Sequence, residues 1–124
     1  MIHLDTNALI ALPLWLRKGH PLIARVEVGE PVATSAIAWY EYLSGPIDAK
    51  EAHLVENFIE RRVLVTDARQ AQLAADLYNA AGRKRSLKID ALIAAAAIVN
   101  GAELLTLNLQ DFAPFAARGL RLFA

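Results

Sequence analysis

The chain has 124 residues, 56% of them hydrophobic, and contains no cysteine. This length suits one domain over residues 1–124, and the lack of cysteine excludes disulfides, thiolate nucleophiles and thiolate metal sites. Its thirteen basic and thirteen acidic residues cancel, so any binding of nucleic acid must depend on local patches rather than on net charge.

The first half of the chain predicts two strands and four helices. A short apolar run at residues 1–4 predicts a strand, and the run from Thr6 to Gly19 predicts a helix that Asp5 or Thr6 caps. The next expected elements, in chain order, are a short helix at 21–29, a strand at 30–36, a helix at 36–44 capped by Thr34 or Ser35, and an amphipathic helix at 48–60.

The second half continues the alternation of strands and helices. A strand is expected at 63–66, and a helix from Asp67 to Gly82 begins with Gln70 three residues after Asp67, which resembles a capping box. A further helix at 86–101, a strand at 103–106 and a fifth strand at 120–123 complete the chain. This alternation predicts an α/β fold with a central parallel sheet of four to five strands, covered by helices on both faces.

No apolar run approaches the ~20 residues that a membrane-spanning helix needs. The chain also lacks the charged and apolar regions of a signal peptide at its start. We therefore expect a cytoplasmic protein. No glycine-rich phosphate loop occurs either, which argues against a nucleotide-hydrolysing P-loop protein.

Two carboxylates stand in apolar surroundings in the first half of the chain. Asp5 directly follows the first predicted strand, and ligands of parallel α/β sheets bind beyond the carboxyl ends of the strands. A helix cap explains Asp5 equally well. Glu41 lies four residues after Ile37, on the same stripe of a predicted helix, between aromatic neighbours. A solvated helix face is the alternative for Glu41.

Asp90 is the sharpest candidate for a functional acid. It is the only ionisable residue between Lys88 and Glu103, in a helix that is apolar on nearly every side, so we expect it to be buried. A buried charge costs several kcal/mol unless it is paired or bound to a metal. The dipole of the helix returns only ~0.3–1 kcal/mol.

A fourth candidate follows the strand at 103–106, where Asn108 and Asp111 come shortly after Thr106. Taken alone, Asn and Asp are ordinary loop residues. Carboxylates from two strand ends and two helices would repel one another if they met, and a hard cation such as Mg²⁺ or Mn²⁺ relieves that repulsion. Such a cation can activate a water to attack a phosphodiester.

Four segments of the chain resemble the PIN-domain family, and within it the VapC-type toxins. They are "LDTNALI" at 4–10, "TSAIAWYEYLSG" at 34–45, "LKIDALIAAAAIVNGAELLTLNLQDF" at 87–112 and "GLRLF" at 119–123. The resemblance covers nearly the whole chain in the expected order. It implies a three-layer α/β/α fold, a Mg²⁺- or Mn²⁺-dependent ribonuclease that acts as the toxin of a toxin–antitoxin pair, a VapB-type antitoxin as partner, and a homodimer.

The resemblance also assigns site residues. Asp5, Glu41 and Asp90 match the three core acids of the family. Many members carry Asp where this chain has Asn108, and Asp111 follows three residues later. We assign the fourth catalytic and metal-binding role to Asp111, with Asn108 in support. The remaining supporting polar residues are Thr6, Asn7 and Thr106.

Contacts with RNA require positive charge. The segment "GRKRSLK" at 82–88 places basic side chains just before Asp90, where they can hold phosphates beside the metal. These residues are Arg83, Lys84, Arg85 and Lys88. A solvated connection between two helices is the alternative reading of this segment.

Three other functions compete with a ribonuclease. A haloacid-dehalogenase-like phosphatase would need a second acid at position 7, where this chain has Asn7. A response-regulator receiver would need paired acids near the first strand and a late lysine. The third alternative is a PIN-like domain that binds RNA or a protein without cutting, and the departure at Asn108 leaves room for it.

Overall fold

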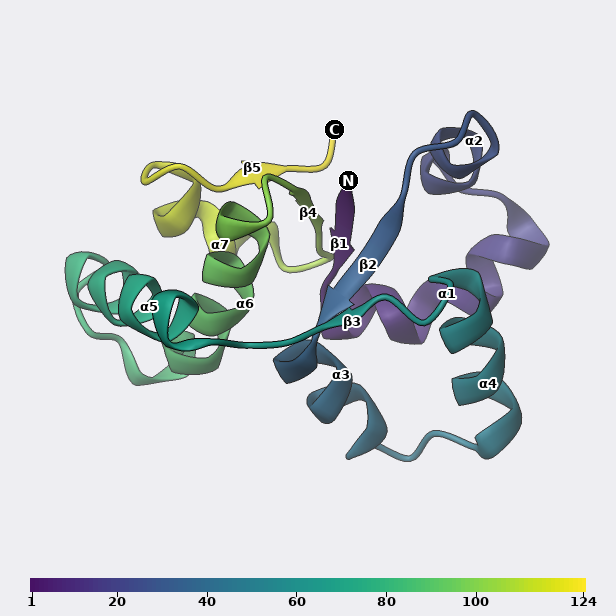
Figure 1. The fold of residues 1–124 in the computed structure, drawn as a ribbon, viewed down its shortest axis with the longest axis horizontal. Helices are drawn as coiled ribbons and strands as arrows, with labels where there is room; N and C mark the ends of the chain where they lie inside the picture. The colour runs from purple at the N-terminus through teal and green to yellow at the C-terminus, as the bar shows by residue number, and fades with distance from the viewer.

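Five parallel strands form one sheet at the centre of the computed structural model, which describes residues 1–124 (Figure 1). The strands are β1 (Ile2–Leu4), β2 (Val32–Ser35), β3 (Val63–Leu64), β4 (Glu103–Leu105) and β5 (Arg121–Leu122). Their order across the sheet is β3-β2-β1-β4-β5. The predicted parallel sheet is confirmed, although β3 ends at Leu64, two residues before the expected end of the strand at Thr66.

Helices cover both faces of the sheet and make three layers. They are α1 (Thr6–Lys18), α2 (Pro21–Glu27), α3 (Ala36–Leu43), α4 (Ala49–Phe58), α5 (Ala68–Ala80), α6 (Lys88–Val99) and α7 (Leu109–Ala116), with a short 3₁₀ helix η1 (Arg85–Leu87) before α6. Figure 1 shows α5, α6 and α7 on one side of the sheet and α1, α2 and α4 on the other. No helix combines the length and apolar character that a bilayer crossing requires.

The strand order explains why the helices divide in this way. From β1 to β3 the chain moves in one direction across the sheet, and from β3 it returns past β1 to add β4 and β5 on the other side. Crossovers between parallel strands are right-handed, so a reversal of direction puts the later helices on the opposite face. The reversal leaves β1 and β4 as neighbours whose following segments diverge.

Short polar side chains begin most of the helices, as the sequence predicts. Asp5 caps α1, Ser35 caps α3, and Asp48 caps α4 through the backbone N–H of Glu51. Asp67 accepts from the N–H of Gln70 at 2.9 Å, but the Gln70 side chain returns no bond and its buried Oε1 has no partner. The predicted capping box is therefore only half formed.

The core owes its close packing to small residues in α6. Ala91, Ala94, Ala95 and Ala97 are buried with almost no exposed surface, and they let the helix approach the sheet and α5 closely. Phe112 and Phe115 of α7 fill the remaining space from the same face and are fully buried. The alanine-rich composition of this segment thus reflects packing on two sides.

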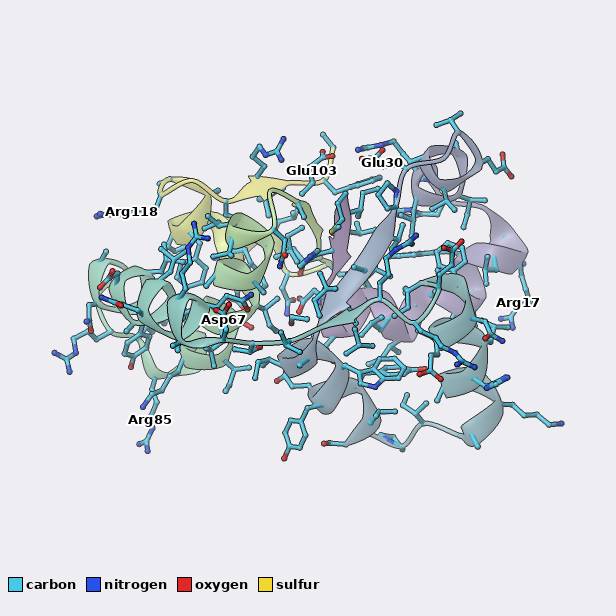
Figure 2. All side chains as sticks on the ribbon, in the orientation of Figure 1. Arg17, Glu30, Asp67, Arg85, Glu103 and Arg118 are labelled. Carbon is cyan, nitrogen blue, oxygen red and sulfur yellow. The ribbon has the colours of Figure 1, made fainter.

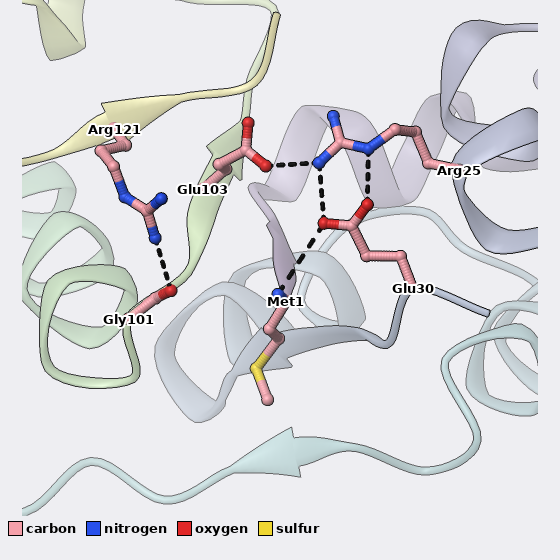
Figure 3. A network of polar contacts seen from close by, with 6 residues as sticks. All are labelled: Met1, Arg25, Glu30, Gly101, Glu103 and Arg121. Atoms are coloured by element: carbon pink, nitrogen blue, oxygen red, sulfur yellow. Dashed lines mark hydrogen bonds and ion pairs between the residues drawn. The ribbon is translucent and has the colours of Figure 1, made fainter. Parts of the chain in front are cut away.

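A charged cluster ties α2 to the amino ends of the strands (Figure 3). Arg25 donates to both oxygens of Glu30, with Nε at 2.5 Å from Oε2, and it also pairs with Glu103 at the start of β4. The amino group of Met1 lies 3.8 Å from Glu30, and the guanidinium stacks over the ring of Phe123 at 4.9 Å. These charges stabilise the amino-terminal edge of the sheet, which is opposite to the edge at which the strands end.

Candidate metal centre and active site

The carboxyl ends of β1 and β4 meet at the point where the sheet reverses direction. The backbone N–H of Asp5 donates to the carbonyl of Leu105 at 3.0 Å, which extends the pairing of the two strands by one residue. Ligand sites of open α/β sheets form at such a reversal, because the chain segments that follow the two strands separate and leave a crevice. Asp5 therefore stands where the fold builds a site.

A pocket of about 250 Å³ opens at this reversal. Three carboxylates line it from three elements: Asp5 after β1, Glu41 on α3 and Asp90 on α6. The remaining lining residues are Thr6, Asn7, Ile10 and Asn108. Residues that the sequence places far apart thus converge on one opening, and the lining contains no lysine or arginine.

Asp5 is the most buried of these acids, with 4% of its surface exposed. Its Oδ1 accepts from the N–H of Thr6 at 2.8 Å and caps α1, while its Oδ2 accepts from the hydroxyl of Thr106 at 2.7 Å. Burial raises the pKa of Asp5, the two hydrogen bonds oppose that rise, and the charges of Glu41 and Asp111 add to it. Asp5 therefore caps α1 and also lines the pocket.

Glu41 is held in place by the first turn of α1. The hydroxyl of Thr6 donates to its Oε1 at 2.8 Å. Thr6 and Asn7 therefore lie beside the acids, as the resemblance implies. The hydroxyl hydrogen of Thr6 is used in the bond to Glu41. Glu41 is only partly exposed and lines the pocket, so it does not lie on a solvated helix face.

Asp90 departs from the prediction because it is only partly buried. It lies in the first turn of α6, where the helix reaches the pocket, so its carboxylate faces the opening instead of the core. Burial and then the nearby charges of Asp5, Asp111 and Glu41 raise the pKa of Asp90 to about 6. The shift therefore combines the cost of burying this carboxylate with its repulsion by the other acids at the mouth of the site.

The candidates for the fourth position lie on the loop and helix that follow β4. Asn108 lines the pocket, and its side chain makes no cap to α7. Asp111 lies in the first turn of α7, is exposed and does not line the pocket. Its charge nevertheless raises the pKa of both Asp5 and Asp90, which means that it lies within electrostatic reach of the cluster.

The four basic residues just before and at the start of α6 lie outside the pocket. Arg83, Lys84, Arg85 and Lys88 are all exposed, and Figure 2 shows the Arg85 side chain extending away from the body of the protein. Lys88 lines a separate groove of about 210 Å³ between α5 and α6. Any contact of this segment with a polymer must therefore involve parts of the polymer beyond the acidic pocket.

Ile10 was missed by the sequence analysis. It lines the pocket while 53% of its surface is exposed. Ile10 lies one helical turn after Thr6, so the same four-residue spacing that identifies helix faces could have assigned it to the site. An apolar side chain of this kind at the mouth of a charged pocket can contact a base or a partner protein.

Replacing Thr106 with valine tests how Asp5 is held. The hydroxyl of Thr106 donates to Asp5 and accepts from the N–H of Asn108 at 3.0 Å. Thr106→Val leaves both groups without their partner in a buried place, so we expect the free energy of unfolding in urea to fall by about 1–3 kcal/mol. Thr106→Ser, which keeps the hydroxyl, should lose clearly less.

Thr66→Val is the matched control. The hydroxyl of Thr66 is also removed from solvent but has no hydrogen-bond partner. Its loss should leave the free energy of unfolding unchanged or raise it. Equal losses for the two valine variants would contradict the role given to Thr106.

The donor set of the pocket fits a hard divalent cation. All of its charged and amide groups offer oxygen, which Mg²⁺ and Mn²⁺ prefer. No group of three or more acidic or histidine side chains is gathered closely enough to chelate an ion by itself. That spacing suits Mg²⁺, which typically takes one or two carboxylates directly and keeps several waters.

Comparisons with known proteins agree with this geometry. The family model described as the PIN domain matches residues 2–116. A search of curated proteins finds no match.

Solved structures extend the likeness over the whole chain. FitAcB from Neisseria gonorrhoeae is 25% identical, with a TM-score of 0.69, and the match covers 100% of this chain and 97% of that one. A toxin–antitoxin complex from Klebsiella pneumoniae is 26% identical, with a TM-score of 0.68 and 91% of each chain covered. DNA-bound VapBC from Salmonella typhimurium is 24% identical, covers 98% and 96%, has a TM-score of 0.72 and supports the fold alone.

Proposed function

Because this chain belongs to the PIN domain family, we propose that it is a divalent-metal-dependent endoribonuclease and the toxin of a VapBC-type toxin–antitoxin pair. The observation that carries the proposal is the convergence of Asp5, Glu41 and Asp90 on one pocket at the reversal of the sheet. Partial burial, and then repulsion by the neighbouring acids, raises the pKa of Asp90 to about 6, so a cation bound beside it would stabilise its charged form.

The residues divide the work of hydrolysis between them. Asp5 and Asp90 would hold a Mg²⁺ or Mn²⁺ ion, and Glu41 and Asp111 would complete the acidic cluster directly or through waters. An ion bound there would lower the pKa of a water and neutralise charge on the phosphodiester. A carboxylate of the cluster takes the proton from the attacking water.

Supporting residues keep the acids in position. Thr106 fixes Asp5, and Thr6 fixes Glu41, each through one short hydrogen bond. Asn108 offers a neutral oxygen where many relatives carry a further acid. The product expected from the family resemblance is an RNA fragment with a 5′-phosphate.

The basic segment at residues 83–88 holds the part of the RNA that lies outside the pocket. Arg83, Lys84, Arg85 and Lys88 present four exposed positive charges on a protein whose net charge is zero. Phosphate contacts of this kind supply affinity without sequence preference. The segment ends where α6 begins, two residues before Asp90, so an RNA strand bound to it runs past the acids.

Two protein partners complete the proposal. Structures with toxin–antitoxin names among the neighbours support a VapB-type antitoxin that covers the site in the cytoplasm. Ile10 and Leu14, exposed on one face of α1 beside the pocket, offer it an apolar contact. Tyr40 and Leu43, exposed on α3, favour a second apolar surface that a homodimer would cover.

Cleavage of end-labelled total RNA tests the activity. Purified protein free of antitoxin is incubated with Mg²⁺ or Mn²⁺, with a chelator, and as the Asp5→Asn variant. We expect discrete fragments only from the wild-type protein with metal. Cleavage that survives both chelation and Asp5→Asn would disprove the metal mechanism. Intact RNA after incubation with folded wild-type protein would favour the domain that binds without cutting.

A further inference from the structure

Asn7 has an orientation that the fold decides. It is the second residue of α1 and lines the acidic pocket. Its Oδ1 accepts from the backbone N–H of Leu107, in the loop after β4, at 3.1 Å. Because a backbone N–H can only donate, the carboxamide oxygen must face Leu107. The amide nitrogen, with its two hydrogens, is left on the other branch of the side chain.

Hydrogen-bond donors are scarce in this pocket. Asp5, Glu41 and Asp90 only accept when ionised, and Ile10 is apolar. The hydroxyl of Thr6 is already used by Glu41 at 2.8 Å. Two amides remain, Asn7 and Asn108, and only Asn7 is oriented by a bond to the backbone. A phosphodiester that enters the pocket brings two acceptor oxygens with a negative charge.

We propose that Asn7 is a substrate-contacting residue whose Nδ2 donates to a non-bridging oxygen of the phosphodiester that is cut. The inference rests on the proposed function and adds a binding role to a residue that so far only borders the acids. The N–H of Leu107 acts as a positioning group, since it holds the Asn7 oxygen and thereby aims the nitrogen at the substrate. The same contact ties α1 to the loop that carries Asn108.

Two variants of Asn7 separate donation from support. Asn7→Asp keeps an oxygen for the Leu107 N–H but removes both donor hydrogens, whereas Asn7→Ala removes everything. A hydrogen bond to a charged group is worth enough to change a rate about 10- to 100-fold. We therefore expect kcat/KM for RNA cleavage to fall about 10- to 100-fold in both variants. The affinity for Mn²⁺, measured by calorimetry, should fall in neither.

Leu107→Pro examines the positioning group by itself. Leu107 is exposed. Proline removes its N–H, and it also replaces the side chain and fixes the backbone φ, so Asn7 keeps its donors and loses its orientation. A smaller fall in kcat/KM than in Asn7→Ala is expected. Asn57→Ala, on an exposed position of α4 without a side-chain hydrogen bond, is the matched control and should cleave like the wild type.

The pattern of results decides the matter. If Asn7 only supports the loop, Asn7→Asp will cleave like the wild type, while Asn7→Ala and Leu107→Pro will lose activity alike, and the inference is then wrong. The pair of Asn7 variants gives this answer even if Leu107→Pro does not fold. An inactive wild-type protein would instead refute the proposed function, so the two failures are distinguishable.

Discussion

Asp90→Asn is expected to abolish metal-dependent RNA cleavage and at the same time to stabilise the metal-free protein. Asparagine keeps the shape of the side chain but removes a charge that partial burial disfavours and that Asp5, Asp111 and Glu41 repel. The rise of the Asp90 pKa from 3.8 to about 6 corresponds to about 3 kcal/mol at most. Because the group is partly solvated, we expect a gain of about 1–2 kcal/mol in urea unfolding at pH 7.5 with a chelator.

Metal reverses the order of the two proteins in that experiment. Saturating Mg²⁺ or Mn²⁺ should stabilise the wild-type protein and leave Asp90→Asn nearly unchanged, because a ligand stabilises the state that binds it. Asp76→Asn, an exposed acid on α5, is the matched control and should alter neither cleavage nor stability. A destabilised Asp90→Asn protein in chelator would show that the acids do not repel one another as described.

Metal affinity should fall steeply below about pH 6. In the metal-free protein Asp90 takes up a proton as the pH drops through its pKa of about 6, and a bound cation must displace that proton. Each further pH unit should therefore weaken Mn²⁺ binding about tenfold, until other acids also titrate. Calorimetric titration from pH 5 to pH 7.5 measures this slope. A flat profile would exclude Asp90 as a ligand.

The stability of the metal-free protein supplies an independent check with a defined sign. Between pH 4 and pH 6 the folded protein keeps the Asp90 proton more tightly than the unfolded chain, so this group makes folding less favourable as the pH rises. His3 acts in the opposite direction, because burial lowers its pKa to about 4 and its stabilising effect is lost as the pH falls from 6.5. Subtracting the profile of Asp90→Asn isolates the first contribution.

The sheet and the location of the site were predictable because they depend on local signals. Asp5 and Ser35 each stand at the end of a strand and cap the helix that follows. One or two residues are enough to predict both the end of the strand and the start of the helix. Once the strands alternate with helices, the rules for parallel sheets place Asp5 at the functional edge. The predicted end of β3 was wrong, because Val65 is as apolar as Val63 but lies exposed beyond the last residue that pairs with β2.

Features that depend on tertiary packing could not be read in the same way. The apolar pattern around Asp90 predicted burial, yet the pocket that exposes its carboxylate is lined mostly by residues from other parts of the chain, namely the first turns of α1, the helix α3 and the loop after β4. Gln70 has the right spacing for a capping box, but its side chain is buried and its Oε1 makes no hydrogen bond to the start of the helix. The sequence likewise could not separate Asn108, which lines the pocket, from Asp111, which acts on it only through its charge.

The bond from Thr106 to Asp5 has a consequence for the making of the protein. It spans 101 positions, from the first strand of the sheet to the fourth. During synthesis Asp5 leaves the ribosome 101 residues before Thr106, the partner that holds this acid, and Asp111 follows later still. Under the proposed function, a nascent or prematurely terminated chain therefore has no working site. If the proposed function holds, a cell meets an active toxin only in chains that extend past Thr106 and Asp111, and these are the form that an antitoxin needs to recognise.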